Sequence, residues 1–194
     1  IMVAGGTSKG GSERILLQVL GKSVDVVVVN IKQAACPHVV ADLTNPWPFT
    51  DATFDAVFST WVLEHLREPS FFFCEAYRVL SADGFIVVTV PFIQRKHGSP
   101  FDYWRFTDTT LMHMARAAGF GYVEVWSVGG TPFLCATSLL WPLFRVPILS
   151  ALLVVSATLA DYALLAITHF LKRGGELVSS YPIAYVLYAH KGLR

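Results

Sequence analysis

Two histidines and an aspartate are the residues of this sequence best suited to moving a proton. His65 lies shortly after the apolar run 54–58, while His97 and Asp102 lie in the segment 92–106, which is dense in His, Asp, Arg and aromatic residues. Imidazoles and carboxylates are common general bases in proteins. Because long segments of this kind in compact domains tend to be functional, we expect this segment to act as a lid over a reaction site.

The elements that must position these residues are two strands joined by a helix. The apolar run 54–60 is followed by an amphipathic segment and by a second apolar run that ends at Pro91. This order predicts a strand, a crossover helix and a buried parallel strand. In open α/β sheets, ligands bind just beyond the carboxyl ends of such strands. We therefore expect Thr60, Trp61 and the residues up to His65 to lie at the functional edge of the sheet.

The helix between these strands has a core-facing stripe and a polar face. Its apolar side chains recur at helical spacing, and Ser70 is expected to cap its first turn. The dipeptide at 83–84 is expected to break the chain before the next strand. Glu75 and Arg78 fall on the opposite face, where we expect a solvated ion pair.

A glycine-rich turn follows the first apolar strand, at 1–4. Gly5, Gly6, Thr7 and Gly10 precede a helical pattern at 15–20. Glycine lets the backbone approach a ligand closely, and the start of a helix offers N–H groups that have no partner within the helix. The pattern predicts a nucleotide-binding turn, and an ordinary tight strand-to-helix turn is the alternative.

Further apolar runs complete the secondary-structure prediction. Strands are expected at 25–30, 38–41, 122–128 and 183–190, and a helix capped by Thr107 or Asp108 precedes the third of these. Together with the three strands above, they make seven strand candidates. Strands that alternate with helices predict an α/β fold with a mostly parallel sheet.

The order FDAVFSTWVLEHL…EAYRVLSADGFIVVTVPF at 54–92 resembles the second half of class I S-adenosylmethionine-dependent methyltransferases, in particular the type 11-like subgroup. Gly84 keeps the second glycine of the subgroup's R-V-L-x-x-G-G motif, while Asp83 replaces the first. The run DYWRFT at 102–107 is similar to a mark of one bacterial branch. The resemblance covers roughly residues 1 to 128 and the final strand. It implies a Rossmann-like seven-stranded sheet with helices on both faces, its last strand antiparallel between strands five and six.

The resemblance also implies a cofactor and a set of site residues. S-adenosyl-L-methionine would lie against Gly5, Gly6, Thr7, Gly10, Asn30, Ile31, Asp42, Leu43, Thr60 and Trp61. The substrate would lie against Glu64, Tyr103, Trp104 and Arg105. Two positions depart from the family pattern, because Val3 and Asn30 stand where that family usually has acidic residues. An amide at position 30 can still accept from one ribose hydroxyl and donate to the other.

Methyl transfer from a sulfonium is an in-line displacement, so the protein mainly aligns the nucleophile with the methyl group and excludes water. A base is needed only if the acceptor is a hydroxyl or a protonated amine. We favour His65 over His97 and Asp102, with a hydrogen bond from His65 to the backbone as the structural alternative. Arg105 is expected to clamp an anionic substrate group, or else to pair with Asp102 or Asp108.

Composition narrows the classes of function. The chain has 194 residues, of which 54% are apolar and 15% charged, and its net charge is +1, so it shows no nucleic-acid footprint. We expect a single domain over 1–194 in a reducing, cytoplasmic setting, because the three cysteines suggest no disulfide framework. The abrupt apolar start at Ile1 suggests that the native beginning is missing. No metal site is expected, because His38, His113, His169 and His190 show no ligand spacing.

An apolar stretch at 132–173 fits no ordinary element of this family. Its nearly continuous helical pattern, 148–171, contains a single charge at Asp161. We expect an apolar helical insertion before the last strand, which either contacts the inner face of the membrane peripherally or forms a homodimer interface. A true membrane span is the weaker alternative, because a charge near its middle costs about 2.5–3.5 kcal/mol.

The substrate class expected for the methyltransferase is a small molecule or a glycan or lipid precursor, methylated on oxygen or nitrogen. A non-catalytic module with the same fold is the first alternative, motivated by Val3 and Asn30. The second is a nicotinamide-dependent short-chain oxidoreductase, which the runs GGTSKGG at 5–11 and DLT at 42–44 resemble. That family's Asn-Ala-Gly and Tyr-x-x-x-Lys motifs are missing from this sequence.

Overall fold

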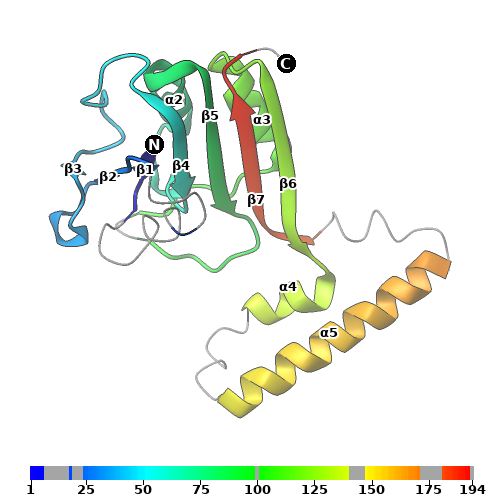
Figure 1. The fold of residues 1–194 in the computed structure, drawn as a ribbon. Helices are drawn as coiled ribbons and strands as arrows, with labels where there is room; N and C mark the ends of the chain where they lie inside the picture. The colour runs from blue at the N-terminus through cyan, green and yellow to red at the C-terminus, as the bar shows by residue number, and fades with distance from the viewer. Residues whose placement is uncertain (7–17, 19–23, 99–100, 140–146, 171–180, 193–194) are drawn as a thin grey trace.

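The computed structural model describes residues 1–6, 18, 24–98, 101–139, 147–170 and 181–192. Its strands form one seven-stranded sheet of order β3-β2-β1-β4-β5-β7-β6 (Figure 1). They are β1 (Met2–Ala4), β2 (Val27–Asn30), β3 (Val39–Val40), β4 (Phe54–Thr60), β5 (Leu80–Pro91), β6 (Tyr122–Gly130) and β7 (Tyr181–His190). The strands β1 to β5 pair in parallel, and β7 is antiparallel to both β5 and β6. The predicted Rossmann-like sheet, with its last strand inserted antiparallel between strands five and six, is confirmed.

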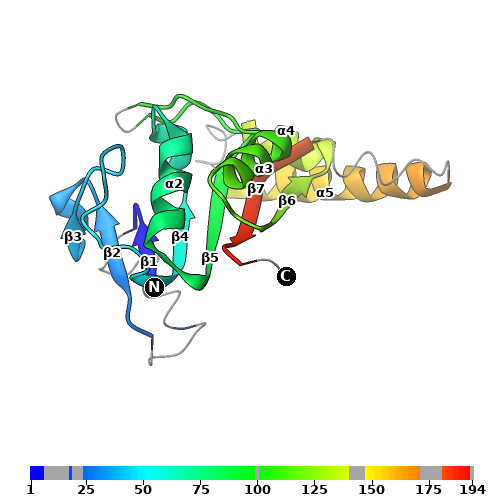
Figure 2. The same cartoon turned by 90° about the horizontal axis from the view of Figure 1, so that it is seen from above.

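Two helices, α2 (Pro69–Val79) and α3 (Asp108–Ala117), cover one face of the sheet (Figure 2). Their apolar side chains pack against the sheet in a core that includes Phe72, Phe73, Ile86 and Leu111, all fully buried. The helix expected at 15–20 lies outside the described residues.

Of the two predicted helix caps, the one on α3 is correct and the one on α2 is wrong. The Thr107 side chain caps α3 by accepting a hydrogen bond from the Thr110 N–H, as predicted. Helix α2 instead begins at Pro69, with Glu68 at the cap position and no side-chain cap bond, so the expected Ser70 cap is wrong. Proline suits the first helical position because the N–H that it lacks has no partner there.

Strand β5 includes the dipeptide Asp83-Gly84, which we expected to lie before the strand. Phe54 pairs with Leu80 and Ala56 pairs with Phe85, so residues 81–84 form an irregular insertion within the β4–β5 pairing. The helix-to-strand connection is therefore shorter than predicted, and the chain enters the sheet directly from α2.

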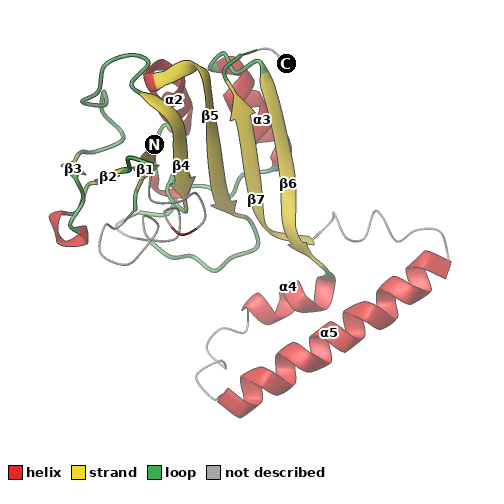
Figure 3. Ribbon diagram, in the orientation of Figure 1, coloured by secondary structure: helices red, strands yellow, loops and turns green. Residues whose placement is uncertain are grey.

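The carboxyl ends of β1, β2, β4 and β5 lie at one edge of the sheet, where the loops and turns of the candidate site gather (Figure 3). Strand β6 is antiparallel to β7 and thus runs in the same direction as β5, so it ends at this edge too. Helices α4 (Pro132–Leu139) and α5 (Pro147–Phe170) follow β6 and extend from this edge as an arm (Figure 1).

Glu75 and Arg78 were expected to be a solvated pair, and the structure corrects this. Glu75 is buried and accepts a 2.7 Å hydrogen bond from the Trp47 N–H, while Arg78 donates to Glu75, to Asp51 and to the Phe49 carbonyl, each at 2.8 Å. The pair therefore fastens the loop before β4 to helix α2. The hydrogen bonds from Arg78 lower the pKa of Glu75, even though burial acts in the opposite direction.

We expect Glu75→Gln to lower the free energy of unfolding at pH 7 by about 1–3 kcal/mol, because charge-assisted hydrogen bonds are lost. A lowered folded-state pKa means that the carboxylate stabilises the fold above its unfolded value of 4.5 and ceases to do so as the pH falls through the folded pKa. Urea unfolding at several pH values should show the wild-type advantage shrinking below about pH 4. Glu68→Gln, at an exposed position, is the control. An advantage that stays constant down to pH 3 would contradict the assignment.

Candidate active site

The loop after β1 and the turn after β4 approach each other closely. Gly5 has φ +77°, and its N–H donates to the Val29 carbonyl at 2.8 Å. A Cβ at this position would lie 2.3 Å from Val62 Cγ2, so no side chain fits there. Gly6 is buried beside it, whereas Thr7 and Gly10 lie outside the described residues.

Asn30, at the end of β2, ties this glycine loop down. Its Nδ2 donates to the Gly5 carbonyl at 3.1 Å and to the Gly6 carbonyl at 2.9 Å, and its Oδ1 accepts from the Lys32 N–H. An amide nitrogen has two hydrogens, so both are engaged. Of the two ribose contacts expected from Asn30, only the acceptor lone pair on Oδ1 is left, and the donor half of that expectation is not met in this structure.

Three further predicted cofactor residues lie at the ends of β2 and β3. Asp42 Oδ1 accepts hydrogen bonds from the N–H and the hydroxyl of Thr44, which fixes the turn after β3. Leu43 is buried, and Ile31 is exposed. The structure thus brings Ile31, Asp42 and Leu43 to the same edge as Gly5, and their roles toward a cofactor stay predictions.

The turn after β4 presents the central residues of the site. Trp61 has φ 57°, and its N–H donates to the Thr89 carbonyl at 3.0 Å, so the chain leaves the sheet abruptly after the exposed Thr60. The short 3-10 helix η2 (Leu63–His65) follows, with the Glu64 side chain fully buried. A left-handed non-glycine residue is an uncommon conformation and often marks a functional site.

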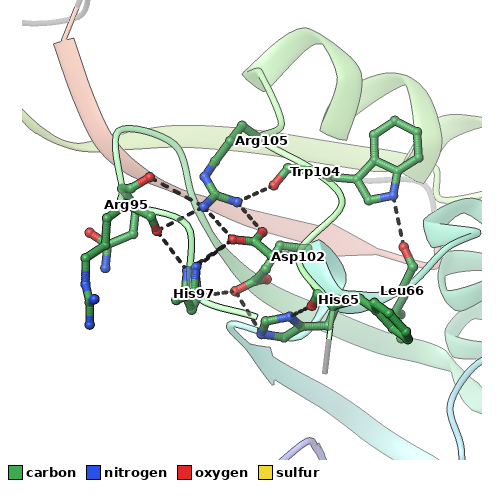
Figure 4. A network of polar contacts seen from close by, with 10 residues as sticks. His65, Leu66, Arg95, His97, Asp102, Trp104 and Arg105 are labelled. Carbon is green, nitrogen blue, oxygen red and sulfur yellow. Dashed lines mark hydrogen bonds and ion pairs between the residues drawn. The ribbon is translucent and has the colours of Figure 1, made fainter. Parts of the chain in front are cut away.

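The segment after β5 folds back onto this turn through three hydrogen bonds (Figure 4). The Tyr103 N–H donates to the Glu64 carbonyl at 2.8 Å, Trp104 Nε1 donates to the Leu66 carbonyl at 2.9 Å, and His65 Nδ1 lies 2.5 Å from the Phe101 carbonyl. The position expected of a lid is therefore the one observed. His65 makes the backbone hydrogen bond that was its structural alternative, and its Nε2 is left facing Glu64.

An ion pair inside the segment fixes its shape. Arg105 contacts both carboxylate oxygens of Asp102, at 2.5 and 2.8 Å, and Asp102 also accepts from the His97 N–H at 2.9 Å. The hydrogen bonds from Arg105 hold the pKa of Asp102 well below its usual range, which disfavours Asp102 as a general base relative to the two histidines. Arg105 further donates to the backbone carbonyls of Gln94, Arg95 and Trp104, so both of its Nη atoms are engaged within the chain, and its role as a substrate clamp stays a prediction. The alternative pairing with Asp102 is the one found.

Glu64, His65 and His97 converge at the centre of the site. Glu64 Oε1 lies 3.4 Å from His97 Nε2 and 3.8 Å from His65 Nε2, and the two imidazole rings are 5.4 Å apart. Burial raises the pKa of the Glu64 carboxyl, while the nearby imidazoles of His65 and His97 oppose the shift. The sequence analysis named each residue separately, with Glu64 as a substrate contact, and did not predict that Glu64 lies between the two histidines. The substrate role of Glu64 stays a prediction.

The aromatic residues of the segment flank this cluster. Tyr103 and Trp104 are both exposed, and Trp104 stacks on the buried Phe106 with ring centroids 6.0 Å apart. Trp61 packs edge-on against His97 at 5.8 Å. Tyr103 and Trp104 thus keep surface available to a substrate, and this role stays a prediction. The carbonyls of Leu66, Arg95 and Phe101 take part in the site without any signal in the sequence, because every residue carries a carbonyl.

Comparisons with known proteins agree with this architecture. A family model described as a methyltransferase domain matches residues 11–88. A comparison with curated proteins found no match.

Solved structures share the fold at low sequence identity. The [4+2]-cyclase SpnF has a TM-score of 0.60 and 18% identity, covering 100% of this chain and 75% of that one. Phosphoethanolamine N-methyltransferase 2 of Haemonchus contortus, solved with S-adenosyl-L-methionine, has a TM-score of 0.62 and 18% identity, and the chain spans 48% of its length. The 1,6-didemethyltoxoflavin-N1-methyltransferase of Burkholderia thailandensis has a TM-score of 0.58 and 14% identity, with 98% and 70% coverage.

We expect Gly5→Ala to destabilise the fold by about 2–4 kcal/mol, because the added methyl group meets Val62 and the backbone has positive φ. In a Val62→Ala background the same substitution should cost less, since the atom that it meets has been removed. Chemical denaturation of the four proteins in this double-mutant cycle measures the coupling. Additive effects would show that Val62 is not what excludes a side chain at position 5.

Proposed function

We propose that the chain is an S-adenosylmethionine-dependent methyltransferase that methylates an oxygen or nitrogen of a glycan or lipid precursor at the membrane surface. The match of residues 11–88 to a methyltransferase-domain model and the fold shared with methyltransferase structures support this proposal. The observation that carries the proposal is the Glu64–His65–His97 cluster at the same sheet edge as the Gly5 loop. A methyl donor on the first strands and an acceptor beside the cluster would meet at this edge.

The residues at the ends of β1 to β3 fit S-adenosylmethionine, which supplies an activated methyl group. The loop at Gly5 cannot carry a side chain, and the Asn30 Oδ1 keeps an acceptor lone pair for a ribose hydroxyl. The exposed Ile31 and the half-buried Asp42 offer apolar and polar contacts for the adenosine. The glycine turn would hold the part of the cofactor beyond the adenosine close to the backbone.

On the acceptor side, the chemistry needs alignment and, for a hydroxyl or protonated amine, a proton acceptor. Carbonyl groups engage Nδ1 of both His65 and His97, so the Nε2 atoms are the ones positioned to accept that proton. The docked segment 92–107 would exclude water from the acceptor.

The cyclase among the solved structures shows that this fold is not limited to methyl transfer. The non-catalytic module is the second candidate, and Val3 and Asn30 at usually acidic positions favour it. The methyltransferase family model and the methyltransferase structures favour methyl transfer over the oxidoreductase alternative.

The membrane part of the proposal comes from helix α5. Its stretch Ile148–Ile167 is long and apolar enough to cross a bilayer, with a mean hydropathy of 2.0, and most of it is exposed. Large apolar side chains are exposed along it at Ile148, Leu152, Val155, Leu159, Tyr162 and Ile167. Such an apolar surface on a soluble chain marks a membrane or protein contact.

The polar groups of α5 distinguish lipid from other partners. The hydroxyls of Ser156 and Thr158 donate to carbonyls of their own helix. Asp161 is 5% exposed and accepts a 3.0 Å hydrogen bond from the Phe133 N–H of α4, so its charge points away from the exposed face. An exposed face on which the hydroxyls of Ser156 and Thr158 are satisfied within the helix suits the acyl boundary of a bilayer, where water is scarce.

Because the arm emerges from the sheet edge that carries the cluster, contact with a bilayer would bring this edge toward the lipid (Figure 1). An acceptor anchored in the membrane could then reach the site without leaving the bilayer. This arrangement favours a lipid-linked acceptor and a peripheral position at the inner face of the membrane.

We expect S-adenosylhomocysteine to bind the full chain with micromolar affinity in titration calorimetry, and NADH to give no heat. Radiolabelled S-adenosylmethionine should pass its methyl group to a component of a membrane lipid extract. Binding without transfer to lipid or soluble extracts would favour the non-catalytic module. The absence of binding at millimolar S-adenosylhomocysteine would overturn the proposal.

We expect the protein to float with vesicles of phosphatidylcholine and phosphatidylglycerol. Leu152→Glu combined with Leu159→Glu should lower the floated fraction about tenfold or more, because two apolar side chains would no longer be buried in lipid. Val40→Glu, at an exposed apolar position on β3, is the matched control. A double variant that changes only the size of the protein in gel filtration would identify α5 as a dimer interface instead.

A further inference from the structure

Two carboxylate oxygens and one imidazole nitrogen, all buried, face one another at the centre of the site. Neither carboxylate oxygen of Glu64 has a hydrogen-bond partner among the described residues, nor has His97 Nε2, although all three atoms are buried. One oxygen lies 3.4 Å from His97 Nε2 and 3.8 Å from His65 Nε2. A buried carboxylate without a partner is costly, so such an arrangement calls for a positive charge in its midst.

Backbone carbonyls lie within hydrogen-bond distance of Nδ1 on both imidazoles. The Phe101 carbonyl lies 2.5 Å from His65 Nδ1, and the Arg95 carbonyl lies 3.2 Å from His97 Nδ1, with Asp102 Oδ2 at 3.6 Å. A carbonyl can only accept, so each Nδ1 carries a hydrogen, and in the neutral imidazole each Nε2 then presents its lone pair toward Glu64. Metal-binding histidines have this same support, with the second nitrogen donating to a carbonyl or carboxylate.

We propose that Glu64, His65 and His97 bind a divalent transition-metal ion, with Zn²⁺ as its best representative. The three ligand atoms lie within 4.8 Å of one another. With bonds of about 2.0–2.1 Å, tetrahedral ligands lie roughly 3.3–3.5 Å apart, so a small contraction of the cluster would complete the geometry. Two imidazoles and one carboxylate suit Zn²⁺ and its neighbours better than Mg²⁺ or Ca²⁺.

Three protein ligands leave at least one coordination position open, which is the pattern of catalytic rather than structural zinc sites. The segment 92–107 and the turn after β4 supply the ligands from two sides, so an ion would also hold the lid on the turn. The open position would take an oxygen of the acceptor, such as a hydroxyl or a phosphate, and would acidify a bound hydroxyl. The binding site itself stands whether or not the chain transfers a methyl group.

Zinc binding tests the proposal directly and without S-adenosylmethionine. The full chain, free of any histidine tag, is treated with a chelator, and Zn²⁺ is then titrated by calorimetry and by equilibrium dialysis. The experiment uses the Cys36→Ser, Cys74→Ser background, because both thiols are exposed and would bind Zn²⁺ adventitiously. We expect one ion per chain at micromolar or lower free Zn²⁺.

Two ligand variants and one matched control decide the location. Glu64→Gln keeps the shape of the side chain but removes its charge, and His97→Ala removes a ligand, so each should weaken binding at least about tenfold. His113→Ala removes an exposed imidazole from α3 and should leave binding unchanged. Circular dichroism checks that the variants fold. If His97→Ala does not fold, the affinity of Glu64→Gln for Zn²⁺ decides the location of the site. Unchanged affinity in a folded Glu64→Gln variant, or no binding below millimolar Zn²⁺, would overturn the proposal.

Discussion

The ion pair between Asp102 and Arg105 is the contact on which the candidate site depends. The Asp102 carboxylate is almost fully buried, with 2% of its side chain exposed, and such a charge is stable only when paired and hydrogen-bonded. Arg105 and the His97 N–H meet that need together. The pair thereby joins His97, Asp102 and Arg105, and the same segment places the Phe101 carbonyl and the Tyr103 N–H on the turn after β4.

The same closure determines what Glu64 and His97 can do. Because the loop lies over the turn, Glu64 is removed from water, and its oxygens face two imidazoles rather than solvent. Asp102 and Glu64 are thus carboxylates with opposite tasks. The first is held as a stable anion by Arg105, and the second keeps lone pairs that no hydrogen bond uses.

The sheet could be predicted because its signals are local. The runs 27–29 and 85–88 are apolar throughout, which is typical of parallel strands buried on both faces, and Thr107 caps α3 by a bond within four residues. The site could be predicted only as a set of residues at one edge. Glu75 reaches Trp47 across 28 positions, and Asn30 reaches Gly6 across 24, and nothing in the sequence says which amide or carboxylate will find such a partner. The bonds from Arg105 to three backbone carbonyls went unpredicted for the same reason, whereas its pairing with Asp102 was one of the expected alternatives.

In the arm formed by α4 and α5, one such long-range hydrogen bond changes how Asp161 is interpreted. In the sequence, Asp161 is a charge in the middle of an apolar helix, which argues against a membrane span. In the structure its carboxylate accepts from the Phe133 N–H, so α4 shields the charge and the opposite face of α5 is apolar. Spanning a bilayer with α5 alone would strip α4 away and expose that carboxylate to hydrocarbon. It would also oppose the return of the chain to β7, which must pair with β5 and β6. The proposed position along the membrane surface would keep both contacts, and it would leave the sheet edge that carries the Glu64 cluster turned toward the lipid.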